Sequence, residues 1–168
     1  MSTKVSRSDI ADYLNVSKTA TADWAFMGAG FNSLNESPGA QTEEKIYISD
    51  VTSSSTIKSY KTVFAFDTDY LKGEQAIDDI ISIGRDHAIG SAAERDYVRV
   101  DLFNPVAEGV TDKFLARKFR VAVEVSSMTG GGGETVTASG NLNCVGDPVQ
   151  GYFDTTTKTF TEGAYVPA

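Results

Sequence analysis

The sequence predicts an α+β fold that is mainly β, an antiparallel β-sandwich or barrel of about seven strands with one flanking α-helix. Two long segments, residues 97–103 and 118–125, alternate between apolar and polar side chains, as a strand with one buried face does. A third segment, residues 135–145, alternates in the same way but carries small neutral groups on its polar side. One further segment has the period of an amphipathic helix.

The first third of the chain is mostly polar. Residues 1–20 are rich in Ser, Thr and Ala and have no sustained period, so we expect an arm ordered mainly by contacts with another molecule. Residues 24–28 form a short apolar strand that ends at a glycine. Residues 30–57 predict a long loop with one short strand over 45–48, and a loop of this length in a small domain is usually functional or disordered. A strand is expected over residues 57–67.

The helix is predicted between Lys72 and Asp86. Its apolar positions recur at i, i+3 and i+4 spacing, and they are Ala76, Ile77, Ile80, Ile81 and Gly84. Residues 67–69 supply N-cap candidates, and Gly90 closes the segment. The part of the chain after the helix is predicted to form strands, over residues 95–103, 116–126, 135–145, 150–154 and 158–161. A turn at 154–157 is expected to join the last two.

Length and charge limit the classes of function. The 168 residues fit a single domain, residues 1–168, and the one cysteine, Cys144, cannot form an internal disulfide. No apolar run approaches the roughly 20 residues that span a membrane, so no membrane partner is expected. The net charge is −8, from 23 acidic and 15 basic residues. An acidic chain of this kind is not expected to bind nucleic acid tightly, although passing close to DNA is compatible with its charge.

No group of residues predicts an enzyme, a metal site or a cofactor. His87, the single histidine, follows the predicted helix, where it is expected to help cap the helix end. The glycines at 130–133 are not followed by the Lys-Ser/Thr and helix of a phosphate-binding loop, so they predict a hairpin tip. Asp96, Arg99 and Asp101 are expected to form a solvated ladder of ion pairs across strands.

Several segments, taken in order, resemble the tail tube (major tail) proteins of tailed bacteriophages. They include Trp24-Ala25-Phe26-Met27-Gly28, Phe64-Ala65-Phe66-Asp67 and the segments 96–103, 116–125 and 139–147, and the resemblance runs from about residue 24 to residue 160. It implies a structural virion protein that polymerises as stacked hexameric rings around a conduit for DNA ejection. It also implies the partners: further copies of the chain, a tape measure protein, a tail terminator, and tail-tip or baseplate proteins. DNA would pass through without specific binding, and the protein would be found in the virion tail after assembly in the host cytoplasm.

Two sets of residues are candidates for this role. The wall of the conduit is expected to carry polar side chains from the alternating strands, namely Lys118, Arg120, Glu124, Thr137, Ser139 and Asn141. Contacts between subunits are expected from the loop over residues 30–57, with Asn35, Glu36, Gln41, Glu43 and Glu44 as candidates. A β-sandwich binding or adhesion module is the alternative function, since the same strand pattern serves both. A small lipocalin-like carrier or enzyme is a third class, which lacks the polar cluster it would need.

Overall fold

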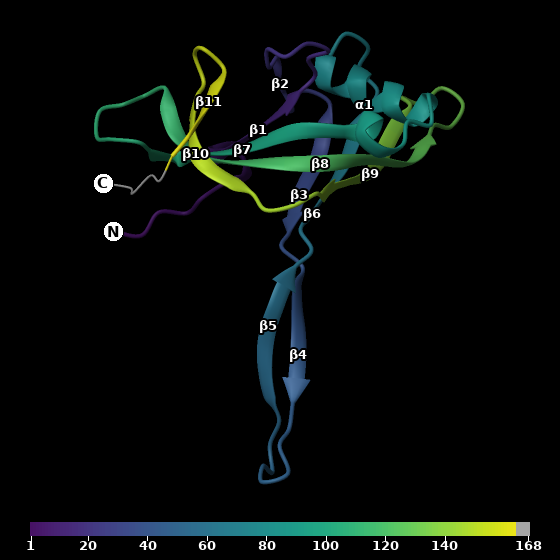
Figure 1. Cartoon of the computed structure of the whole chain (residues 1–168). Coiled ribbons are helices and arrows are strands. Elements are labelled where there is room, and N and C mark those ends of the chain that lie inside the picture. Colours follow the sequence, from purple (N-terminus) through teal and green to yellow (C-terminus); the bar gives the residue numbers. More distant parts are fainter. Residues whose placement is uncertain (164–168) are drawn as a thin grey trace.

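The computed structural model describes residues 1–163, which form a nine-stranded antiparallel sheet, one α-helix and a separate two-stranded hairpin (Figure 1). The predicted fold class, mainly β and antiparallel with one flanking helix, is confirmed, with eleven strands in the described residues instead of about seven. The elements are η1 Arg7–Asp9, β1 Ile10–Asn15, β2 Trp24–Phe26, β3 Phe31–Ser37, β4 Ala40–Lys45, β5 Ser54–Tyr60, β6 Val63–Asp69, α1 Gln75–Arg85, η2 Gly90–Ala93, β7 Glu94–Pro105, β8 Lys113–Thr129, β9 Thr137–Cys144, β10 Val149–Asp154 and β11 Thr159–Glu162.

The sheet runs in the order β2-β1-β7-β8-β9-β6-β3, and β8 is the strand that joins its two halves. With 17 residues, β8 is long enough to pair β10 along its first part and β9 along its second part. The small hairpin β10–β11 therefore branches from the same strand that carries β9.

The main hydrophobic core lies between the sheet and α1. Phe119, Val121 and Val123 of β8 are buried on one face, as the alternation predicts, and they pack in one cluster with Ile80 and Ile83 of the helix. At the centre of this core three aromatic rings meet, those of Phe64, Tyr97 and Phe119.

A second core lies on the opposite face, near β10. Val98 and Val100 alternate with Tyr97 and Arg99 along β7 and point the other way, into a cluster with Tyr13 and Phe153. The rings of Tyr13 and Phe153 are stacked at 4.4 Å, although two strands separate β1 from β10 in the sheet. The sheet must therefore curl strongly at this end, so that both of its faces bury apolar side chains.

The helix agrees with its predicted period but not with its predicted start. Its N-cap residue is Glu74, while Asp67 and Asp69 belong to β6. Asp79 is a charged residue of the helix that is buried, and Arg95 (2.8 Å) and Lys18 (3.2 Å) pair with its carboxylate. None of the helices in residues 1–163 is long and apolar enough to cross a membrane.

The predicted arm over residues 1–20 is wrong for residues 10–15, which form strand β1 of the sheet. Ile10–Asn15 pairs with β7, and Ala11, Asp12, Tyr13 and Leu14 are all buried. The strand escaped detection because its buried run contains an aspartate, whose partner Arg99 lies far away in the sequence.

The predicted loop over residues 30–57 is largely strand. β3 pairs with β6 and buries Leu34, whereas β4 and β5 form a hairpin that projects from the sheet, apart from the rest of the fold (Figure 1). The predicted strand at 45–48 falls at the end of β4 and in the hairpin's turn. A narrow neck joins the hairpin to the sheet, where Lys61 N–H donates to the Gly39 carbonyl (2.9 Å) and the Thr62 hydroxyl donates to the Pro38 carbonyl (3.3 Å).

Candidate functional site

The predicted wall residues lie on one face of the sheet. Lys118, Arg120, Glu124, Thr137, Ser139 and Asn141 occupy the face of β8 and β9 opposite to Phe119, Val121 and Val123. The pairing register places Glu124 directly opposite Asn141. The two strands thus bring these side chains together as a continuous polar surface, called the polar face below.

Arg120, Lys118 and Glu124 of the polar face each have a close partner. Arg120 donates from Nε to Glu94 and from Nη1 to Asp96, both at 3.2 Å, and Lys118 lies over the ring of Phe160 at 5.3 Å. A hydrogen bond from Asn143 (2.9 Å), with a second from Ser126 (3.1 Å), lowers the pKa of Glu124. Its carboxylate is therefore ionised down to lower pH than an ordinary glutamate.

Acidic residues of β6 and β7 also belong to the polar face. Asp67 lies opposite Ser139 and Asp69 opposite Thr137, while Glu94 and Asp96 flank Arg120. The sequence patterns had placed Asp67 and Asp69 in the helix cap and Asp96 in a ladder of ion pairs, and Glu94 lay just before the predicted strand. For Asp67 and Asp69 a signal of this face was available. The signal was present in the alternation of Val63, Ala65, Asp67 and Asp69 with Phe64, Phe66 and Thr68.

The loop candidates divide between the sheet and the hairpin. Asn35 and Glu36 are not loop residues: they lie in β3, and Glu36 forms an ion pair with Arg117 at 2.7 Å within the same chain. The other three, Gln41, Glu43 and Glu44, lie in exposed β4, where Glu43 pairs with Lys58 at 2.9 Å.

The turn of the β4–β5 hairpin carries apolar side chains that are open to solvent. Ile48 and Val51 are fully exposed, and Ile46 and Tyr47 are more than half exposed. We call residues 46–53 the hairpin tip. Its one charged residue is Asp50, whose carboxylate accepts a hydrogen bond from the Tyr47 N–H at 3.3 Å.

A buried polar network joins β1, β7 and β3. Arg99 donates from Nε to Asp12 (2.9 Å) and from Nη2 to the Leu34 carbonyl (2.9 Å), and the Tyr97 hydroxyl also donates to Asp12. Arg7 reaches the same carboxylate from the surface. Burial, together with the negative charge of Asp12, raises the pKa of Tyr97 well above its ordinary value. The predicted solvated ladder is therefore wrong for Arg99, which is buried.

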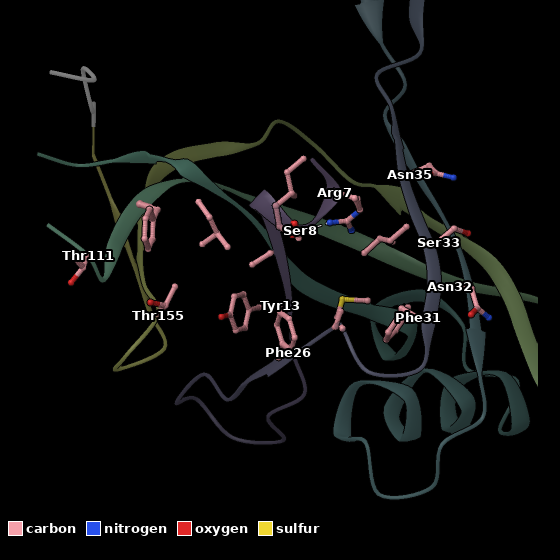
Figure 2. A pocket seen from close by; sticks show the side chains of 17 residues that line it. Arg7, Ser8, Tyr13, Phe26, Phe31, Asn32, Ser33, Asn35, Thr111 and Thr155 are labelled. Carbon is pink, nitrogen blue, oxygen red and sulfur yellow. Dashed lines mark hydrogen bonds between the residues drawn. The ribbon is translucent and has the colours of Figure 1, made fainter. Parts of the chain in front are cut away.

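A groove of about 720 Å³ lies along this seam, between β1 and β3 (Figure 2). Its apolar lining consists of Ile10, Ala11, Tyr13, Phe26, Met27, Phe31, Leu34, Leu102 and Phe114. In Figure 2 the segment carrying Ser33 and Asn35 forms one wall, and Tyr13 and Phe26 lie on the other side. Among the described residues that line the groove, Arg7 alone carries a charge.

The remaining reactive groups are dispersed. In the part of the chain that the structure describes, no three His, Cys, Asp or Glu residues are grouped so as to hold a metal ion. His87 is exposed just after the helix, with a left-handed backbone (φ 50°). Burial raises the pKa of Cys144 to about 11, so its thiol is a weak nucleophile near neutral pH.

Comparison with known proteins gives a likeness in structure alone. No family model matches the chain, and no curated protein matches it. A chain of the SPP1 tail tube, determined by solid-state NMR and cryo-electron microscopy, superposes with a TM-score of 0.61 at 13% identity, covering 88% of this chain and 78% of that one. A chain of the anti-feeding prophage baseplate superposes with a TM-score of 0.48 at 6% identity, covering 92% and 99%. The chain therefore has the fold found in a phage tail tube.

Proposed function

We propose that this protein is a structural subunit of a phage-type tail tube, in which hexameric rings stack around a conduit for DNA. The observation that carries the proposal is the fold shared with the SPP1 tail tube chain over 88% of this chain. The subunit works without catalysis or a cofactor. It resides in the virion tail, after assembly in the host cytoplasm.

The polar face suits the inner wall of such a conduit. Asp67, Asp69, Glu94, Asp96 and Glu124 outnumber the bases on this face, and Arg120 is already paired. Because every phosphate contact made by a cation adds affinity, a wall of this kind lets DNA slide without being held. The partners are then further copies of the chain, with a tape measure protein inside, a tail terminator at one end and tail-tip or baseplate proteins at the other.

Assembly of the purified chain tests the proposal. We expect multiangle light scattering to detect oligomers whose mass rises with concentration, and negative-stain microscopy to show rings with six-fold symmetry and stacked tubes. Tail-tip proteins, where needed, would serve as nuclei. A chain that stays monomeric at high concentration in the presence of such nuclei would rule the proposal out and would favour a binding module.

A further inference from the structure

We infer that the groove between β1 and β3 is the receptor for the hairpin tip of a second copy of this chain. The inference rests on the proposed function, because it assumes that copies associate, and it adds the place on the neighbouring subunit where the hairpin binds. Three observations support it: an uncovered apolar tip, a groove with an apolar lining, and one charge of opposite sign on each.

The tip has apolar surface that its own chain does not cover. Ile48 and Val51 are fully exposed at the end of a hairpin whose two strands are themselves exposed throughout. Moving apolar side chains out of water is favourable, so the tip gains free energy wherever it finds an apolar cavity.

The groove offers a cavity with an apolar lining. Its volume of about 720 Å³ is similar to that of small-molecule sites in proteins, about 300–1,000 Å³, so it has room for several side chains. Phe26 is half exposed on its wall. β3 is the last strand of the described sheet, and no described strand pairs with its edge away from β6. In β3 the Leu34 carbonyl accepts from Arg99, and the Phe31 N–H donates to the Gly28 carbonyl. An open strand edge beside apolar side chains favours a docked segment.

The charges of the two surfaces are complementary. Asp50 is the one charged residue of the tip, and Arg7, whose side chain is half exposed, is the charged residue among those described along the groove. Arg7 pairs with Asp12, but Arg99 pairs with the same carboxylate, so these three groups together keep one positive charge. A single pair of opposite charges beside an apolar contact fixes the orientation of the tip more than it adds affinity.

The contact must join two copies, not one chain to itself. Six paired residues in β4, at about 3.3 Å each, put the tip about 20 Å beyond the sheet, and the hairpin points away from the body (Figure 1). Because tip and groove are different surfaces, each copy gives one tip and receives another. Such a head-to-tail contact continues from copy to copy, as a stack requires.

Cross-linking between cysteines tests the contact directly. In a Cys144→Ala background, Ile48→Cys on the tip is combined with Ser8→Cys, an exposed groove residue labelled in Figure 2. The matched control combines Ile48→Cys with Ile89→Cys, an exposed apolar position outside the groove. A short bismaleimide should give a ladder of dimers, trimers and larger species with Ser8→Cys and not with the control.

Complementation between variants gives a second test. The tip variant Ile48→Ser/Val51→Ser and the groove variant Phe26→Glu should each raise the critical concentration for assembly at least about tenfold, while Ile89→Ser should change it less than about twofold. A mixture of the two variants should restore a single tip–groove contact, because one copy keeps its groove and the other keeps its tip.

The outcomes separate this inference from the function on which it rests. Tubes that form normally without the Ser8 ladder, or with equal cross-linking at Ile89, would overturn the groove as receptor and leave the tail tube proposal standing. Binding of the monomer to phosphatidylcholine vesicles that is lost with Ile48→Ser, with no ladder, would show that the tip serves a membrane instead. No assembly under any condition would remove both proposals.

Discussion

At the scale of single residues, the buried ion pair is the feature that most constrains this fold. Asp12 and Arg99 come from strands β1 and β7, and Arg99 also reaches the carbonyl of Leu34 in β3. One guanidinium therefore connects three strands across the seam of the sheet. Removing one partner of a buried pair is costly because the other charge stays buried without compensation.

The first prediction is that Arg99→Met lowers the free energy of unfolding of the monomer by about 3 kcal/mol. Arg7 can still pair with Asp12 in this variant, so we expect the loss of unfolding free energy to lie at the lower end of the range for broken buried ion pairs. The control is Arg120→Met, the same change at an exposed arginine paired with Glu94 and Asp96, where about 1 kcal/mol or less is expected. Urea unfolding followed by circular dichroism measures both, and equal losses would contradict the structural role assigned to Arg99.

The second prediction concerns Asp101, whose pKa is raised above the ordinary value, mainly by burial. The Asp101 carboxyl binds its proton more tightly in the folded state than in the unfolded state. The stability that this binding contributes is fully present below the unfolded pKa and is lost as pH rises through the folded pKa. Asp101→Asn, which keeps the neutral form, should therefore stabilise the protein at pH 7 and change little near pH 3. Exposed Asp147→Asn controls for the loss of one negative charge, and the same pH dependence in both variants would contradict the argument.

At the scale of elements, the helix and the long strands were predictable because each has one buried face. Helix α1 was predicted from the spacing of Ala76, Ile77, Ile80 and Ile81. Strand β8 and its polar side were predicted from the alternation around Phe119. The hairpin could not be found in this way. All residues of β4 and β5 are exposed, so neither strand has an apolar face for the sequence to mark.

Two further strands, β1 and β3, could not be predicted because their burial depends on residues far away in the sequence. The burial of β1 depends on Arg99, 87 positions after Asp12, and no local pattern reveals that pairing. Likewise β3 buries only Leu34, and its polar neighbours resemble a loop until β6 pairs with them. Of the candidate site, the polar positions of β8 and β9 were predictable, whereas the groove was not, because it forms where opposite ends of the sheet approach each other.

The third prediction is that the hairpin serves assembly and not the fold of the monomer. Replacing residues 41–59 by a two-glycine turn should leave the melting temperature of the monomer within about 3 °C, because these side chains are exposed, and should abolish stacked tubes. The deletion begins after β3, which ends at Ser37, so the edge strand of the sheet stays intact. Shortening the exposed glycine segment at 130–133 is the control, and an unfolded monomer after removal of 41–59 would contradict the prediction.

At the scale of the whole molecule, the distribution of charge agrees with the proposed passage for DNA. On the polar face, acidic residues are more numerous than basic residues, and the net charge of the chain is −8. Only charges on the wall itself would act directly on DNA inside a tube, so the polar face matters more than the total.

The fourth prediction is that Thr137→Lys, Ser139→Lys and Asn141→Lys together leave rings intact but slow DNA ejection. The added cations would bind phosphates, and the delay should be larger at low salt because salt screens the attraction. Single-particle ejection assays at two salt concentrations measure it. A variant with lysines at exposed Gln75, Ser82 and Thr156 carries the same added charge elsewhere and should eject normally. Equal delays in both variants would show that this face does not line the passage.

The neck at the base of the hairpin has a mechanical consequence for an assembled tail. Between the sheet and β4–β5, the chain narrows to Pro38–Gly39 on one side and Lys61–Thr62 on the other, where a Cβ on Gly39 would lie 2.2 Å from the Lys61 carbonyl oxygen. If hairpins bridge successive rings, bending load concentrates at these thin crossings while each sheet moves as a stiff block. Flexural rigidity, measured as a persistence length from micrographs, would then depend on four residues per subunit instead of on the packed cores.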